Sequence, residues 1–164
     1  MKTTHEQIKK SLALDIATDA ELAAYCRAQF GRPPLVIVNR YGDDGFPGES
    51  VSPFVFLYSD GENELGDVEE ETFEVVATVG ACDAADSPTR KVLRERTDEA
   101  SGLVVSGIAD RLEAVREMVE RIVRKSTHGA CFRTAARTES SLLDWPLEWA
   151  QLRINYFEPE TLDN

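Results

Sequence analysis

Residues 107–125, GIADRLEAVREMVERIVRK, carry the clearest periodicity in the sequence and decide how the rest is assembled. The apolar positions recur at i, i+4, i+7, i+11 and i+14: Ile108, Leu112, Val115, Val119 and Ile122. The other side carries charge: Glu113, Arg116, Glu117, Glu120, Arg121 and Arg124. Glu117–Arg121 and Glu120–Arg124 are favourable i,i+4 pairs. A helix with one apolar face has to cover another layer. The pattern therefore predicts a helix over 107–125, lying on a sheet and ended by His128-Gly129.

Three strands are predicted before this helix, at 35–38, 54–58 and 72–79. The first two, LVIV and FVFLY, are short runs rich in β-branched and aromatic residues. The third alternates, with one face made of Phe73, Val75, Ala77 and Val79 and the other of Thr72, Glu74, Val76 and Thr78. That alternation is typical of a half-buried strand.

Two further strands are predicted after the helix, at 132–138 and 148–157. The last strand places Ala150, Leu152, Ile154 and Tyr156 on one face and Trp149, Gln151, Arg153 and Asn155 on the other. The charged stretch 83–100 is predicted to be a long connection with a short helix around 89–96.

The first thirty residues predict helix, because apolar residues recur there at helical spacing. Asp19 is the expected N-cap of a second helix, and Gly31, followed by Pro33-Pro34, its expected end. The whole pattern predicts an α+β fold: a mixed or antiparallel sheet of about five strands, one long amphipathic helix packed on it, and an N-terminal helical region. The 164 residues fit a single domain, with 1–31 as the helical region and 34–158 as the core.

The negative charge of the chain is concentrated in one third of the sequence. The formal net charge is −12, and no Lys or Arg occurs between Arg40 and Arg90, where thirteen acids lie. Nucleic-acid binding draws on Lys and Arg contacts, so this segment is not expected to grip DNA. No apolar run is long enough to span a bilayer, and residues 1–11 lack the apolar core of a signal peptide. These features predict a cytoplasmic protein.

Catalytic signatures are missing from the sequence. There is no GxSxG, Walker A, HExxH or GxGxxG pattern. The three cysteines, Cys26, Cys82 and Cys131, have no CxxC spacing and are read as small buried hydrophobes. We expect no catalytic, cofactor-binding or metal-binding residue. Two alternatives stay open: a Cys131 nucleophile paired with His128, and a Ca²⁺ site in the acid-rich loop at 60–67.

Two groups of residues are candidate assembly surfaces. The first is an acid-rich loop expected at 59–70, and its candidate acids are Asp60, Glu62, Glu64, Asp67, Glu69, Glu70 and Glu71. The second joins two aromatic residues beside Pro146 to arginines of the last two strands, namely Trp145, Trp149, Arg133, Arg137 and Arg153. Exposed Trp and Arg often anchor a partner. Two alternatives stay open: the tryptophans pack in the core, or the arginines are simply exposed to solvent. An acidic and a basic surface on one chain suit a head-to-tail assembly.

The order of these elements resembles that of the tail terminator, or tail completion, family of long-tailed bacteriophages. Three stretches carry the likeness: PFVFLYSDGENE with ETFEVVATVGACD, GIADRLEAVREMVERI, and FRTAARTESSLLDWPLEWAQLRINYFEPE. Together they span about 34–158. The sequence departs from the family in its long N-terminal helical region and its bulky, charged 83–100 connection.

The resemblance implies a virion structural protein, without catalysis or cofactor, that forms a ring of six subunits. Such a ring caps the finished tail tube, meets the tube protein on one side and the head–tail connector on the other, and lets DNA pass. The protein would be cytoplasmic during assembly and then part of the virion tail. If a ring forms, we expect some of the acids at 60–71 to line its lumen. Alternatives are another connector or minor tail protein, an acidic binding module for a basic protein partner, and an enzyme centred on Cys131 or the 60–71 carboxylates.

Overall fold

The computed structural model describes residues 5–40, 53–59, 72–82, 96–98, 100–105, 108–126, 132–139 and 147–157. Within these ranges the helices are α1 (His5–Ala17), α2 (Ala20–Phe30) and α3 (Ala109–Lys125). The strands are β1 (Leu35–Val38), β2 (Phe54–Tyr58), β3 (Thr72–Cys82), β4 (Arg96–Asp98), β5 (Leu103–Val105), β6 (Phe132–Glu139) and β7 (Leu147–Phe157). The α+β class with N-terminal helices, a mixed sheet and a long helix packed on it is confirmed.

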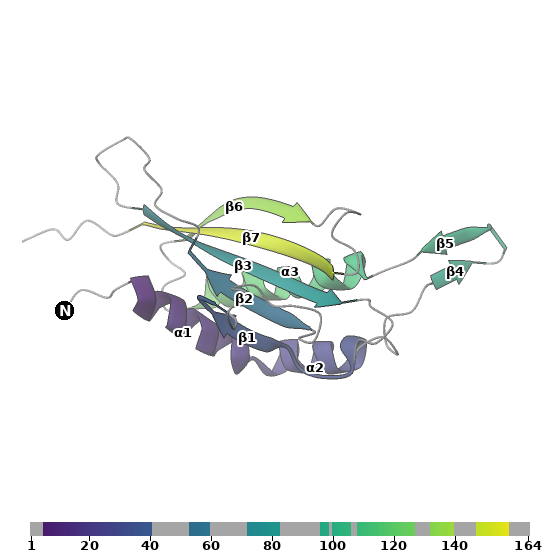
Figure 1. Ribbon diagram of the computed structural model, residues 1–164, viewed down its shortest axis with the longest axis horizontal. Coiled ribbons are helices and arrows are strands. Elements are labelled where there is room, and N and C mark those ends of the chain that lie inside the picture. The colour runs from purple at the N-terminus through teal and green to yellow at the C-terminus, as the bar shows by residue number, and fades with distance from the viewer. Residues whose placement is uncertain are drawn as a thin grey trace, which may run out of the picture.

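Five strands form one mixed sheet in the order β1-β2-β3-β7-β6 (Figure 1). Strands β1 and β2 are parallel, and the other neighbours are antiparallel. The long strands β3 and β7 form the centre and pair along their full length, from Thr72 opposite Phe157 to Cys82 opposite Leu147. Strands β4 and β5 form a separate two-stranded hairpin, which stands apart from the sheet in Figure 1.

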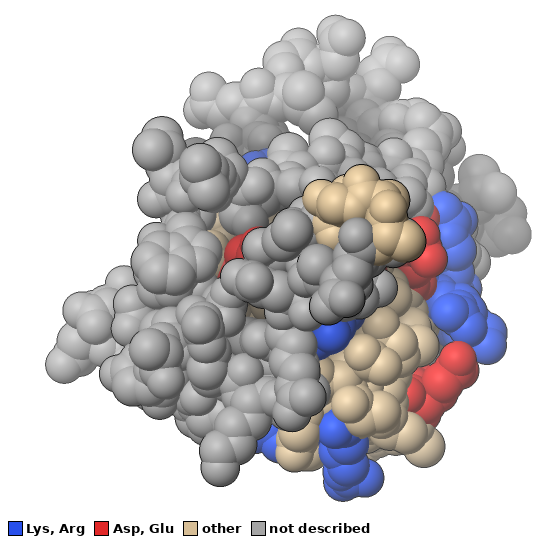
Figure 2. Space-filling view, turned by 90° about the vertical axis from the view of Figure 1, so that its right-hand side faces the viewer, with Lys and Arg blue, Asp and Glu red and all other residues tan. Residues whose placement is uncertain are grey.

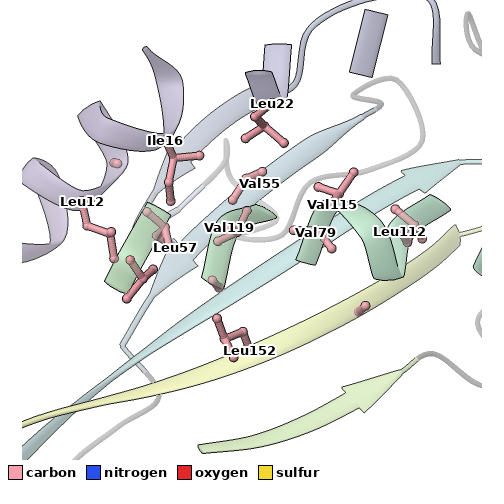
Figure 3. Close-up of a cluster of buried hydrophobic side chains, with 14 of the residues drawn as sticks. Leu12, Ile16, Leu22, Val55, Leu57, Val79, Leu112, Val115, Val119 and Leu152 are labelled. Atoms are coloured by element: carbon pink, nitrogen blue, oxygen red, sulfur yellow. The ribbon is translucent and has the colours of Figure 1, made fainter. Parts of the chain in front are cut away.

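One face of the sheet packs against all three helices. Alternate residues of the central strands, such as Val75, Val79 and Leu152, are fully buried there against α1, α2 and α3. Figure 3 shows Val79 and Leu152 of the strands together with Leu12 and Val119 of the helices, in the layer between the helices and the strands. The apolar stripe of α3 and the alternation of β7 thus bury one another, as the sequence pattern predicts.

The opposite face of the sheet has a second, smaller core. Ile37, Phe54 and Phe56 are buried there, with Tyr58 and Leu147 packed against them. Gly80 lies opposite Phe54 in the register, and a Cβ added at Gly80 would lie 2.4 Å from Cζ of the Phe54 ring. The ring therefore occupies the space that a side chain at position 80 would need.

The local start and stop signals around α2 act as predicted. The Asp19 side chain accepts a hydrogen bond of 2.8 Å from the Leu22 N–H, and Gly31 ends the helix with a φ of 85°. This left-handed conformation is one that glycine adopts without strain.

The ends of α3 use partners that the sequence pattern does not reveal. The N-cap residue, Ile108, has no side-chain acceptor for the helix, and Glu148 of β7 accepts a 2.8 Å hydrogen bond from the Ile108 N–H. The helix ends at Lys125, and the Ser126 hydroxyl donates to the Val123 carbonyl at 2.9 Å. The helix thus ends at the predicted last residue, and His128-Gly129, the predicted stop signal, lies outside the described residues.

Three predictions about the elements are wrong in part. Strand β3 continues to Cys82, and both of its faces are buried from Val75 onward, because the second core covers Val76 and Thr78. Arg116 and Glu120 of α3, predicted on the solvent side, are buried, whereas Ile122 is only partly buried and Val123 lies in the core. The 83–100 connection contains strand β4, so position 96 is extended rather than helical; residues 83–95 lie outside the described ranges.

Candidate assembly surfaces

The acid-rich segment lies outside the described residues, but both points where it joins the fold are described. The chain leaves β2 at Ser59 and re-enters the sheet at Thr72, the first residue of β3. The antiparallel pairing of Tyr58 with Val76 puts these two points at the same end of the sheet. The candidate acids in between are Asp60, Glu62, Glu64, Asp67, Glu69, Glu70 and Glu71.

A polar cluster ties α1 to this end of the sheet. Lys9 is buried, and its Nζ lies 2.7 Å from Oε1 of Glu6 and donates a 3.2 Å hydrogen bond to the Ser59 hydroxyl. The Asn39 amide, just after β1, donates to Oε2 of Glu6 at 3.0 Å. The hydrogen bonds from Lys9 and then Asn39 hold the pKa of Glu6 below its usual value. A charged Lys9 is thus satisfied although its side chain is enclosed.

Of the candidate arginines, only Arg153 has a described side chain. Arg153 of β7 lies 2.6 Å from the Glu74 carboxylate, and both side chains are largely buried, so Arg153 has a structural partner within its own sheet. The register places Arg133 opposite Asn155 and Arg137 opposite Leu152, which belongs to the helix-covered face of β7. The side chains of β6 are outside the described part of the molecule.

One of the two candidate tryptophans, Trp149, lies within the described residues. Trp149 is partly buried and lies opposite Gly80 on the face away from the helices. Trp145 falls outside the described residues.

Figure 2 looks onto the end of the molecule from which the β4–β5 hairpin projects, and basic and acidic groups of the described residues are interspersed there. The described residues at this end therefore carry charges of both signs.

Of the three cysteines, only Cys26 has a described side chain. It is fully buried in the helix-covered core, and burial raises its pKa to about 12. The interpretation of this residue as a small core hydrophobe is confirmed. A thiol with so high a pKa is a poor nucleophile at neutral pH. Cys131 and His128, the alternative nucleophilic pair, lie outside the described ranges.

A shallow groove of about 320 Å³ lies between the α1–α2 turn and α3. Met118 and Ile122 contribute its apolar lining, and Glu21 and Arg121 approach to 3.3 Å at its edge. Arg121 therefore pairs with α2 and not with Glu117, the partner predicted from the helical spacing. The other predicted pair, Glu120–Arg124, is formed at 3.0 Å.

The described part of the chain contains no group of three or more His, Cys, Asp or Glu side chains arranged to hold a metal ion. None of the helices in the described ranges is long and apolar enough to cross a membrane.

Three large apolar side chains are exposed within the described ranges, and the sequence pattern gives no hint of them. They are Leu14 of α1, Leu35 of β1 and Leu103 at the start of β5. A signal for the hairpin is present in the sequence, because Leu103-Val104-Val105 is an apolar, β-branched run that follows a Ser-Gly turn.

Comparison of the sequence with protein-family models and with curated proteins finds no match in either.

Proposed function

We propose that this chain is a structural subunit of a bacteriophage or prophage tail: a tail terminator that forms a ring, caps the finished tail tube and joins it to the head. The observation that carries the proposal is where the three resembling stretches fall. They supply β2, β3, α3, β6 and β7, which together form most of the sheet and the helix packed on it. The likeness in element order thus belongs to one packed unit rather than to scattered segments.

The proposed partners follow from this role. Copies of the chain meet each other in a ring, for which six subunits are expected, and the ring meets the tail tube protein and the head–tail connector protein. The protein acts in the cytoplasm during assembly and stays in the virion tail. No catalysis and no cofactor form part of the proposed role.

The acid-rich segment is proposed to line the lumen of the ring. Seven acids and no Lys or Arg lie between Ser59 and Thr72, and both of these residues sit at one end of the sheet. Negative charge concentrated there would repel a phosphate backbone. DNA would then pass through the ring without being held.

The first test is the molar mass in solution, measured by light scattering over a range of protein and salt concentrations, with negative-stain microscopy of the same samples. A mass near six subunits with ring-shaped particles is the expected result. The matched functional assay adds the protein to growing tail tubes and measures their length, which a terminator should limit. A chain that stays monomeric with tube protein present and leaves tube length unchanged would contradict the proposal and favour an acidic binding module.

The lumen is tested by charge reversal at Glu69, Glu70 and Glu71. With all three replaced by lysine, the ring should acquire salt-dependent affinity for DNA that the wild-type ring lacks. Reversal of Glu113, Glu117 and Asp110 on the helix α3 supplies a control with the same change in net charge. Equal DNA binding by the two variants, or a ring with 60–71 on its outer rim, would rule out the lumen assignment.

A further inference from the structure

The β4–β5 hairpin is an arm that finds no partner sheet within the described part of its own subunit. Its strands pair only with each other, from Arg96 opposite Val105 to Asp98 opposite Leu103. Figure 1 places the arm well away from the main sheet. Gly102 turns the chain at its tip with a φ of 71° and has open space around it, and Leu103 is 55% exposed. A two-stranded hairpin alone is at best marginally stable in water, so the arm needs a surface to pack on.

A complementary surface lies at the edge of the sheet, along β1. Within the described ranges this strand is the outermost of the sheet and pairs with β2 alone. The N–H groups of Leu35 and Asn39 donate to Pro53 and Leu57, on the β2 side. In a parallel pair, alternate residues of the outer strand turn their backbone groups away from the neighbour. Val36 therefore presents its N–H and C=O to the open side, as an unpaired sheet edge does.

One exposed leucine lies on this edge. Leu35, the first residue of β1, shares the strand face of the buried Ile37, opposite the helices. Leu14 of α1 is also exposed, but it follows directly after the buried Leu12 and Ala13 and so faces solvent on the side of the helix away from the sheet.

The exposure of Leu35, at 47%, fits a surface that is covered on assembly. A strand laid along β1 would cover this side chain.

We infer that the β4–β5 arm of one subunit lies along the β1 edge of a second copy of this chain. The three-residue strands of the arm match the four-residue edge strand in length. Backbone hydrogen bonds would extend the sheet across subunits, and Leu103 would pack beside Leu35. This contact would bring together two of the three large apolar side chains left exposed in the described ranges.

The contact uses two different surfaces of the chain, and this settles the type of assembly it makes. A subunit whose arm is engaged still offers its own β1 edge to another copy, so the contact is heterologous and repeats. It closes into a ring or continues into a filament. The inference rests on the proposed function for closure into a ring, whereas the arm-to-edge contact stands on the geometry alone.

The test uses two full-length variants, each lacking one half of the contact. Leu103→Glu disables the arm, and Leu35→Glu disables the edge. Light scattering should give a multi-subunit mass for the wild type and the mass of one chain for each variant alone. An equimolar mixture should give two subunits and no more, because one intact arm meets one intact edge. Ala28→Glu, at an exposed position on the outer side of α2, is the control and should keep the wild-type mass.

Each outcome decides a different point. Pairing of the two variants in the mixture proves that both are folded and supports the contact. A monomeric wild type, variants that keep the wild-type mass, or a mixture that stays monomeric would overturn it. A ring unaffected by these changes would leave the terminator role standing and remove the arm contact. Filaments or dimers that depend on Leu103 but do not limit tube growth would support the arm contact and contradict the terminator role.

Discussion

The two faces of the central sheet are buried by different chemistry. On the helix side, residues such as Val75, Val79 and Leu152 meet three helices in a core made of apolar side chains. On the other side, the aromatic pair Phe56 and Tyr58, stacked with ring centroids 4.9 Å apart, shares the face with polar groups. The first face gains its stability from the area removed from water, whereas the second depends on shape and on satisfied hydrogen bonds.

The polar groups of the second face form two connected sets. The Gln151 amide donates hydrogen bonds of 3.1 Å both to the Tyr58 hydroxyl and to the buried Thr78 hydroxyl. Arg153 and Glu74 form an ion pair close by on the same two central strands. A face with such fixed partners tolerates fewer substitutions than an apolar one of the same area, because a removed partner leaves a buried polar group unsatisfied.

The largest expected effect is on the helix side. Leu152→Ala would leave a cavity beneath the helices and should lower the free energy of unfolding by about 2–5 kcal/mol in urea titrations. Leu14→Ala on the outer side of α1, where the side chain is 63% exposed, is the matched control and should change it by no more than about 0.5 kcal/mol. Equal losses for the two variants would mean that burial beneath the helices is not what makes Leu152 stabilising.

A smaller loss is expected from an added methyl group on the second face. In Gly80→Ala the new Cβ would collide with the buried Phe54 ring, which should cost about 1–3 kcal/mol of unfolding free energy. The double variant with Phe54→Leu should lose less than the sum of the two single changes, since the smaller side chain relieves the contact. Strict additivity would show that Gly80 and Phe54 do not compete for space.

Removal of one hydroxyl from the same face should have a milder effect. Thr78→Val keeps the side-chain shape but takes one acceptor from the Gln151 amide, at an expected cost of about 1 kcal/mol. Adding Gln151→Leu together with Tyr58→Phe should recover part of that loss, because all three polar partners are then gone. A triple variant that is less stable than Thr78→Val would contradict this account of the network.

The smallest effect is expected at Glu6 of α1, which contacts Lys9 and Asn39. The folded-state pKa of Glu6 is lowered, so its contribution is present above about pH 4.5 and is lost as the pH falls through the folded-state value. Glu6→Gln should therefore flatten the loss of stability on the acid side, from about pH 5 downward, and leave the alkaline side unchanged. If the free energy of unfolding falls equally steeply with decreasing pH in wild type and variant, the Glu6–Lys9 contact does not contribute to stability.

The helix-covered face is the part of the molecule that sequence periodicity predicts best. The α3 stripe and the alternation of β7 both identify residues of the core, because each repeats with the period of its element. The second face is hidden from such reasoning: Val76 and Thr78 sit at positions that alternate with the core, and nothing in the pattern says that they too are covered. The burial of Arg116 and Glu120 was not predicted either, because a charged residue on a helix is ordinarily expected to face solvent.

The candidate assembly surfaces were less predictable than the fold. Arg153 was a candidate because it lies in sequence near other basic and aromatic residues. Its ion-pair partner, Glu74, is 79 positions away and comes close only because β3 and β7 pair. The exposed Leu35 lies in an element that was predicted correctly, yet its exposure depends on where the sheet ends. Sequence periodicity carries no information about which strand is outermost.

The pairing of β3 with β7 also constrains the order in which the protein can be made. Val79 pairs with Ala150, 71 positions later, so on the ribosome β3 waits beside β2 with one long edge open while the arm, α3 and β6 are synthesised. Closure of so distant a pair is slow compared with local helix formation, and an open edge is prone to wrong pairings meanwhile. Newly made chains of this protein should therefore depend on chaperones, or on slow growth at low temperature, more than their modest length would suggest.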